Sequence, residues 1–210
     1  MEPPYSNGIS AHAATNLHVE SFVGASVARY LPAIAVLRIE VFREWPYLYE
    51  GTRAYETQYL ATYAASSAGV VVIARDGDRI VGASTALPLA QHSDEVVAPL
   101  VGAGHVADAV CYYGESVLDP AYRGRGLGHR FFEEREAHAR AHGFALATFC
   151  AVERPVAHPA RPASYRPLDE LWTRHGFVKR PDITTSFSWL DLGDTEESAK
   201  PMVFWIKELR

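Results

Sequence analysis

Cysteine is scarce in this sequence: only Cys111 and Cys150 occur among its 210 residues. Both lie in apolar runs, and two such residues cannot build the disulfide framework of a small secreted protein. The first residues also lack the basic and apolar regions of a secretory signal peptide. These absences lead us to expect a cytoplasmic protein whose cysteines are reduced.

Long apolar runs and an excess of positive charge are also missing. No apolar stretch approaches the roughly 20 residues that cross a bilayer, so we expect no membrane partner. The formal net charge is −5, whereas a general nucleic-acid surface needs a basic stripe, so we expect no nucleic acid either. Neither His92 nor His105 has a second ligand at helix or turn spacing, and we expect no metal.

The rest of the composition is that of one globular domain. Hydrophobic residues make up 48% and charged residues 21% of the chain, which is ordinary for a soluble fold. Residues 1–16 are rich in small and polar residues and lack periodicity, and we expect a flexible N-terminal tail. Residues 17–210 contain no repeat or low-complexity segment, and we expect a single domain there.

Hydrophobic periodicity predicts a mixture of strands and helices. Alternating or β-branched runs predict strands at 17–23, 69–75, 78–89, 109–118, 144–152, from 177 onward, 184–192 and 201–209. Spacing near 3.6 residues predicts helices at 25–45, 53–65 and 168–175, and a further helix that ends near residue 142. The dipeptide Asp76-Gly77 suits a type I′ turn within the hairpin. Residues 91–107 are expected to form an excursion with some helix.

The stretch from Ala109 to His142 carries the clearest chemistry. An apolar strand, a turn at Asp119-Pro120, a glycine-rich basic loop and a helix follow one another there. Three glycines let a ligand approach the backbone closely: Gly124, Gly126 and Gly128. The start of a helix offers unpaired N–H groups and the positive end of its dipole, and three arginines add charge: Arg123, Arg125 and Arg130. Together they predict a site for the phosphate groups of a small ligand.

The run LDPAYRGRGLG, residues 118–128, resembles the signature of the GNAT N-acetyltransferase superfamily. That signature is Arg or Gln, two residues, Gly, one residue, and then Gly or Ala. Arg123, Gly126 and Gly128 satisfy it. The preceding strand, the following helix and the later His175-Gly176-Phe177 agree with the resemblance.

The resemblance covers most of residues 17–192 and implies an α/β fold of the mixed α+β kind. Its centre would be a mixed, mostly antiparallel, twisted sheet of six to seven strands flanked by helices. Two central strands would splay apart, here near 109–118 and 144–152. Acetyl-CoA would bind between them as the acyl donor.

The resemblance also implies which residues hold the donor. The backbone of Val117 and Leu118 would pair with the pantetheine arm as an added strand does. Main-chain N–H groups of the loop would hold the pyrophosphate, and the residues concerned are Arg123, Gly124, Arg125, Gly126, Leu127 and Gly128. The implied activity is N-acyl transfer from acetyl-CoA to a primary amine by direct attack in a ternary complex.

Catalysis requires that a base take the proton of the attacking amine. Glu115 lies on the strand just before the loop, where many family members place an acid, and the resemblance indicates a general base or an amine-orienting carboxylate. Tyr112 and Tyr113 are alternatives, because strand alternation places one of them on each face. Cys150 suggests a covalent acyl-enzyme, but its apolar surroundings favour a packing role.

The proton donor for the leaving group departs from the family pattern. The usual tyrosine, five residues before the Phe of the Gly-Phe pair, is replaced by Trp172, whose indole N–H is no acid at neutral pH. Tyr165 in the proline-rich segment 153–167 is the alternative donor. A thiolate is also a tolerable leaving group, since a free thiol has a pKa of about 8.5, and then no acid is needed.

The acceptor side is expected at the segment 40–50 and the loop 153–166. The residues that would contact the acceptor are Glu40, Trp45, Tyr47, Tyr49 and Glu50. Their carboxylates favour a cationic amine and their rings an apolar body, so we expect a small-molecule or amino-acid-like acceptor. Two other hypotheses stay open: a non-catalytic CoA-binding sensor, and an enzyme with a longer acyl-CoA or a charged-tRNA donor. A homodimer is possible.

Overall fold

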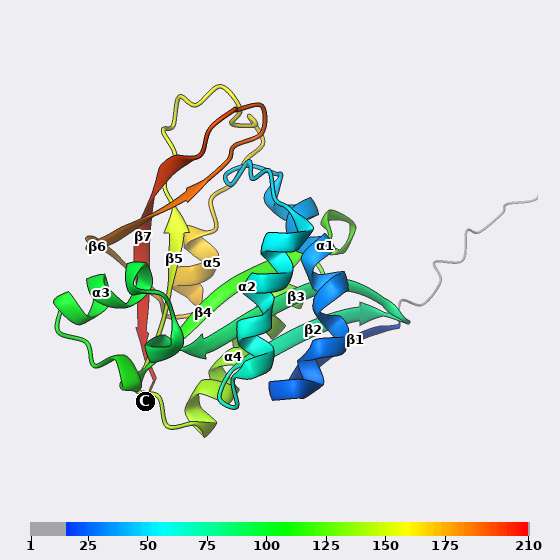
Figure 1. The fold of residues 1–210 in the computed structure, drawn as a ribbon, viewed down its shortest axis with the longest axis vertical. Helices are drawn as coiled ribbons and strands as arrows, with labels where there is room; N and C mark the ends of the chain where they lie inside the picture. The colour runs from blue at the N-terminus through cyan, green and yellow to red at the C-terminus, as the bar shows by residue number, and fades with distance from the viewer. Residues whose placement is uncertain (1–15, 210) are drawn as a thin grey trace, which may run out of the picture.

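One seven-stranded sheet forms the centre of the computed structural model, which describes residues 16–209 (Figure 1). The strand order is β1-β2-β3-β4-β5-β7-β6, and every neighbouring pair is antiparallel except β4 and β5. The strands are β1 (Leu17–Phe22), β2 (Val70–Asp76), β3 (Arg79–Pro88), β4 (Val110–Leu118), β5 (Leu146–Val152), β6 (Val178–Trp189) and β7 (Ser198–Glu208). The predicted mixed, mostly antiparallel sheet is confirmed. The predicted tail lies outside the described residues except for Asn16.

Helices cover both faces of this sheet (Figure 1). They are α1 (Leu31–Phe42), α2 (Arg53–Ala65), α3 (Asp94–Gly102), α4 (Leu127–Ala141) and α5 (Asp169–Arg174), with short 3₁₀ segments at Gly24–Tyr30, Leu89–Gln91, Ala107–Ala109 and Pro120–Tyr122. Helices α1 and α2 share one apolar core with the sheet, and α4 and α5 share another on the opposite face. Among the described residues, none of these helices combines the length and apolar character that a membrane span requires.

Three local predictions differ from the structure. The helix predicted at 25–45 is a 3₁₀ segment followed by α1, because Pro32 fits only the first turn of an α-helix. The hairpin turn is not type I′, which needs a positive φ at both central residues: Gly77 has φ 58°, but Asp78 does not have a positive φ. The two strands predicted from 177 to 192 are one strand, β6, whose register shifts after Arg180.

Strands β4 and β5 separate soon after they begin. Only Val110–Tyr112 pairs with Leu146–Thr148, and the rest of each strand has no partner in the other. The predicted splay of two central strands is therefore present. Backbone groups on this edge of β4 are left free for a ligand, because they have no neighbouring strand.

A β-bulge in β4 decides which face Glu115 occupies. The pairing with β3 shifts by one residue, so Gly114 and Glu115 together lie opposite Thr85. Because side chains alternate along a strand, the extra residue turns Glu115 to the α1–α2 face, while Tyr113 stays on the α4 face. Glycine is needed at 114, since a Cβ there would lie 2.4 Å from both Thr85 Oγ1 and Tyr63 Oη.

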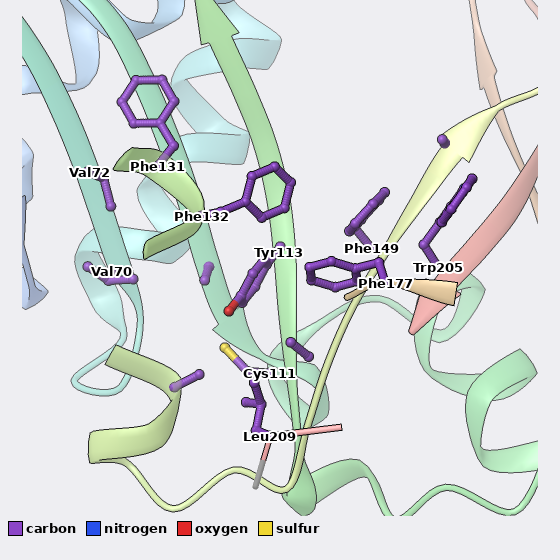
Figure 2. Packing of buried hydrophobic residues seen from close by; sticks show 14 of the residues in the cluster. Val70, Val72, Cys111, Tyr113, Phe131, Phe132, Phe149, Phe177, Trp205 and Leu209 are labelled. Atoms are coloured by element: carbon purple, nitrogen blue, oxygen red, sulfur yellow. The ribbon is translucent and has the colours of Figure 1, made fainter. Parts of the chain in front are cut away.

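The core on the α4 face is rich in aromatic side chains. Figure 2 shows Phe131 and Phe132 of α4 beside Tyr113 of β4, with Phe149 and Trp205 of β5 and β7 next to them. The rings of Phe149 and Trp205 are stacked, with centres 6.3 Å apart. This core fixes α4 against the sheet and so places the glycine-rich loop at the open end of β4.

Candidate active site

A cavity of about 2190 Å³ opens where β4 and β5 separate. It reaches both faces of the sheet, because its lining includes Arg38 and Glu115 on the α1–α2 face and Phe132 and Trp172 on the other. Its lining includes both the start of α4 and the loop between α1 and α2. The two halves of the site predicted from the sequence therefore border one cavity.

The donor end is formed by the loop before α4. Gly124 and Gly126 have φ of 75° and 81°, a conformation that glycine adopts without strain. No side chain of the described residues caps α4, and its first turn contains no acid. A Cβ at Gly124, Gly126 or Gly128 would meet nothing within 4 Å, so there is open space beside these glycines at the start of the helix. A diphosphate fits this arrangement.

The arginines of the loop interact with protein groups. Arg123 Nη1 lies 2.8 Å from Glu44 Oε2, and Arg125 Nη2 donates to a carbonyl of its own loop at 3.0 Å. Arg130 pairs with Glu134 at 3.2 Å. Of the three arginines, only Arg123 lines the cavity. The attraction for an anion thus comes mainly from the backbone and the helix dipole, and less from side-chain charge than the sequence indicated.

Val117 and Leu118 of β4 differ in their relation to the cavity. Leu118 lines the cavity, whereas the Val117 side chain is buried against α1 and α2 and does not. Val117 pairs with Ala83 of β3, in the same register in which Asp119 N donates to Val81 O, so its N–H and C=O face β3 and those of Leu118 face the open edge. Both residues lie on the part of β4 that has no partner in β5, where an extended chain can pair with the free edge.

Glu115 belongs to a buried cluster formed by α1, α2 and β4. Its Oε2 lies 2.6 Å from Arg38 Nη1 and accepts a hydrogen bond from Tyr59 Oη at 3.0 Å. Arg38 Nε donates to Glu56 Oε2, so one guanidinium joins the two carboxylates. Arg38, Glu56 and Glu115 are all buried. We refer to these three residues as the acidic cluster.

The acidic cluster has a net charge of −1 and unused hydrogen-bonding capacity. Glu115 Oε1 and Glu56 Oε1 are buried and have no hydrogen-bond partner among the described residues. Burial would lower the pKa of Arg38, but the carboxylates of Glu115 and Glu56 outweigh it and raise that pKa. The guanidinium therefore stays charged, and the surplus negative charge favours a cation in the adjoining cavity.

The two tyrosines of β4 face opposite sides, as strand alternation requires. Tyr112 lines the cavity, and its hydroxyl lies 3.1 Å from Cys150 Sγ. Burial raises the pKa of Tyr112 well above its ordinary value. Burial also raises the pKa of Cys150 to about 12, so the thiol stays protonated and is a poor nucleophile. This agrees with a packing role for Cys150.

Four of the five residues predicted at the acceptor side line the cavity: Trp45, Tyr47, Tyr49 and Glu50. Glu40 does not, and its side chain is exposed. Residues two apart on a helix do not share a face, and in α1 the buried face includes Arg38. Glu40 therefore lies outside the cavity, and Arg38 is the charged residue of α1 that lines it.

Long-range contacts hold the acceptor wall together, and Figure 1 shows its three segments at the same end of the molecule. Arg154 binds both carboxylate oxygens of Asp191, at 2.7 and 2.8 Å. The same guanidinium donates to the carbonyls of Pro46 and Tyr47, at 3.0 and 2.9 Å. The loop after α1, the 153–167 loop and the turn after β6 are thereby joined into one rigid surface.

Similarity to known proteins agrees with this geometry. The sequence model of the acetyltransferase (GNAT) family matches residues 36–166. The chain belongs to the GNAT family. Membership implies acyl-CoA-dependent transfer of an acyl group. A comparison with curated proteins gave no significant sequence match.

Solved structures of GNAT proteins have the same fold at low sequence identity. An N-acetyltransferase from Staphylococcus aureus Mu50 is 12% identical with a TM-score of 0.61, and the match covers 93% of this chain and 100% of that one. A ribosomal-protein-alanine N-acetyltransferase from Brucella melitensis is 13% identical, with a TM-score of 0.60 and coverage of 91% and 99%. A proposed acetyltransferase from Salmonella typhimurium, solved with acetyl-CoA, is 11% identical, with a TM-score of 0.56 and coverage of 92% and 94%.

Tyr165, the alternative proton donor, and Trp172, which replaces the usual tyrosine, have different surroundings. Tyr165 lines the cavity, its ring lies edge-on to Trp45 with centres 6.0 Å apart, and burial raises the pKa of its phenol. Trp172 packs against Phe149 and Trp205, with ring centres 5.1 and 5.0 Å away. Trp172 thus extends the aromatic core to the cavity wall without offering an acid.

Proposed function

We propose that this GNAT protein transfers an acetyl group from acetyl-CoA to a primary amine of a small-molecule or amino-acid-like acceptor, by direct attack in a ternary complex. One observation carries the proposal: a single cavity connects the uncapped start of α4 with the acidic cluster. The first end suits a diphosphate and the second suits an ammonium group. The acetyl-CoA bound in the Salmonella typhimurium relative supports the choice of donor.

At the donor end, this chain offers backbone rather than side-chain contacts. The N–H groups from Gly124 to Gly128 would hold the pyrophosphate, and the helix dipole adds to the attraction. The free edge of β4 at Leu118 would pair with the amides of the pantetheine arm, next to Val117. Bound in this way, the donor would direct its acyl group into the gap between β4 and β5.

At the acceptor end, Glu115 would orient the amine and take its proton. Its Oε2 is already held by Arg38 and Tyr59, whereas its Oε1 has no hydrogen-bond partner in the described structure. An ammonium group in the cavity that Glu115 lines would be attracted by this carboxylate. Loss of one proton to the carboxylate leaves the neutral amine, whose lone pair can attack the acyl carbon.

A CoA-binding sensor of the same fold is the second candidate, favoured by the absence of a tyrosine at Trp172. Titration calorimetry with acetyl-CoA, followed by a thiol-release assay over a panel of primary amines, separates the two. We expect acetyl-CoA to bind and at least one amine to release CoA thiol faster than the blank. Binding without release for every amine would support the sensor, and no binding at all would contradict both.

A further inference from the structure

Arg135 of α4 is a buried arginine without a carboxylate partner. Its side chain is 2% exposed. Its Nε donates to Phe131 O within its own helix at 3.1 Å, and its Nη1 donates to Thr85 O at 3.5 Å. Within residues 16–209 it forms no ion pair. Burial of a charge without a counter-ion is strongly unfavourable, so this guanidinium requires an explanation.

Two aromatic rings hold the guanidinium in place. It lies over Tyr113 and Phe132, 4.4 and 4.8 Å from the ring centres, and Figure 2 shows these two rings side by side. The faces of aromatic rings attract cations, which explains why the charge is tolerated there. Burial lowers the pKa of Arg135 to about 10, so it is charged at neutral pH. Arg135 also lines the cavity, where a ligand can meet it.

The acidic cluster and Arg135 lie on opposite faces of β4. Glu115 faces α1 and α2, whereas Arg135 rests on Tyr113, which faces α4. The titratable groups around Arg135 are Tyr113, Cys111, Glu115 and Tyr63. Burial raises the pKa of the Tyr113 phenol, the Cys111 thiol and the Tyr63 phenol, so these three are neutral. At β4 the cavity therefore has the acidic cluster on one face of the strand and a positive guanidinium on the other.

Acyl transfer creates positive charge on the amine nitrogen, which the acidic cluster favours, and negative charge on the sulfur, which Arg135 favours. The lone pair of the neutral amine forms a bond to the thioester carbon, and the C–S bond breaks with its electron pair going to sulfur. The nitrogen then releases its surplus proton to water, because Glu115 already holds the first one. Positive charge develops on nitrogen and negative charge on sulfur. Fixed charges that match such a change lower the barrier, because they need no reorganisation during the reaction.

We propose that Arg135 stabilises the thiolate that departs during acyl transfer. This inference rests on the proposed function, in which the thiolate is that of CoA. The guanidinium then takes the role that a proton donor would otherwise have, since a thiolate held beside a cation is a good leaving group at neutral pH. Its unpaired charge is explained as well, because the counter-ion arrives with the reaction.

The test measures the ionisation of CoA bound to the whole protein, by the ultraviolet absorbance of the thiolate as a function of pH. We expect the bound thiol to ionise at a lower pH than free CoA measured in the same way, since one close cation shifts a pKa by about 1–3. Arg135→Met should return the bound thiol to the value of free CoA or above, a change of at least about tenfold in the thiolate-to-thiol ratio. Arg135→Lys, which keeps a charge, should retain most of the effect.

Arg29→Met is the matched control. Arg29 also lies over two rings, Phe22 and Tyr30, at 5.6 and 4.6 Å from their centres, but it is exposed and outside the cavity. The Arg29→Met variant should leave the ionisation of the bound CoA thiol unchanged. A CoA thiol that titrates at or above its free value in the wild-type protein would overturn the inference, whether or not a variant folds. Equal ionisation in wild type and Arg135→Met would do the same, and failure of CoA to bind would overturn the proposed function as well.

Discussion

Arg38 holds two buried carboxylates in place with a single side chain. Its guanidinium contacts Glu56 and Glu115, and it also lies over the Tyr59 ring with 4.4 Å to the ring centre. All three charged groups are shielded from water, so each depends on the others for compensation. Loss of the guanidinium leaves two buried negative charges facing one another.

The first prediction concerns this arginine. Arg38→Met keeps the length of the side chain but removes its charge, and we expect a loss of about 3–5 kcal/mol in the free energy of unfolding. Arg43→Met is the control, because Arg43 pairs with Glu50 at 2.7 Å on the surface, where a salt bridge contributes at most about 1 kcal/mol. Urea denaturation at neutral pH measures both. Equal losses in the two variants would contradict the role given to Arg38.

The second prediction concerns Glu115. Glu115→Gln preserves the shape but cannot take a proton, and we expect turnover to fall by about 100-fold or more with acetyl-CoA affinity unchanged. Glu40→Gln, on the exposed face of the same α1 that supplies Arg38, should leave turnover unchanged. Steady-state kinetics and calorimetry separate the two effects. Full activity in Glu115→Gln would exclude it as the base.

Sequence reasoning located Glu115 but not its surroundings. Helix α1 is apolar at most positions, so the spacing did not reveal which face is buried, and Glu40 was chosen where Arg38 belongs. Glu56 reaches Arg38, and Tyr59 reaches Glu115, only because α2 packs beside α1 over the sheet. Such contacts depend on tertiary structure, and no local pattern in the chain encodes them.

Among the elements, the loop before α4 is the one whose function depends least on the rest of the fold. Its glycines, its position between a strand and a helix, and the absence of a capping side chain are local features. For this reason the glycine-rich loop and the helix start were predictable from residues 118–128 alone. The β-bulge that turns Glu115 was not, because it appears only when β4 is paired with β3.

The third prediction tests this loop. Gly128 has no positive φ and open space around its Cβ position, so a side chain there does not strain the backbone. Gly128→Glu should weaken acetyl-CoA binding by at least about tenfold more than Gly128→Gln, because the two side chains have the same size and only one repels a phosphate. Calorimetry gives both affinities. Similar values for the two variants would mean that no phosphate lies at this helix start.

At the scale of the whole molecule, acid is expected to weaken the fold through His92. Its ring lies against Tyr112 with centres 4.4 Å apart, and its Nε2 is buried without a hydrogen-bond partner in the described structure. Burial lowers the pKa of His92 to about 4, although Glu115 opposes this effect. The folded state therefore resists protonation of a group that the unfolded chain protonates near pH 6.5.

The fourth prediction follows from that difference. Since the folded pKa lies below the unfolded one, the contribution is complete above pH 6.5 and is lost as pH falls towards 4, up to about 3 kcal/mol. His92→Phe keeps a ring against Tyr112 and should flatten the pH dependence of unfolding free energy in this window. His18→Gln, which changes an exposed histidine, should not. Identical slopes in wild type and His92→Phe would contradict the prediction.

The acceptor wall is held together by hydrogen bonds between residues that are far apart in the chain, and this bears on the order in which the site assembles. Trp189 Nε1 donates to Tyr47 O at 3.0 Å, a contact between residues 142 positions apart, and Arg154 bridges the same loop to Asp191. The donor loop, in contrast, lies between β4 and α4, which are neighbours in the chain. Closing a long stretch of chain costs more entropy than closing a short one, so we expect the donor end to form before the acceptor wall. The acceptor wall is complete only when the turn after β6 has docked on the loop after α1.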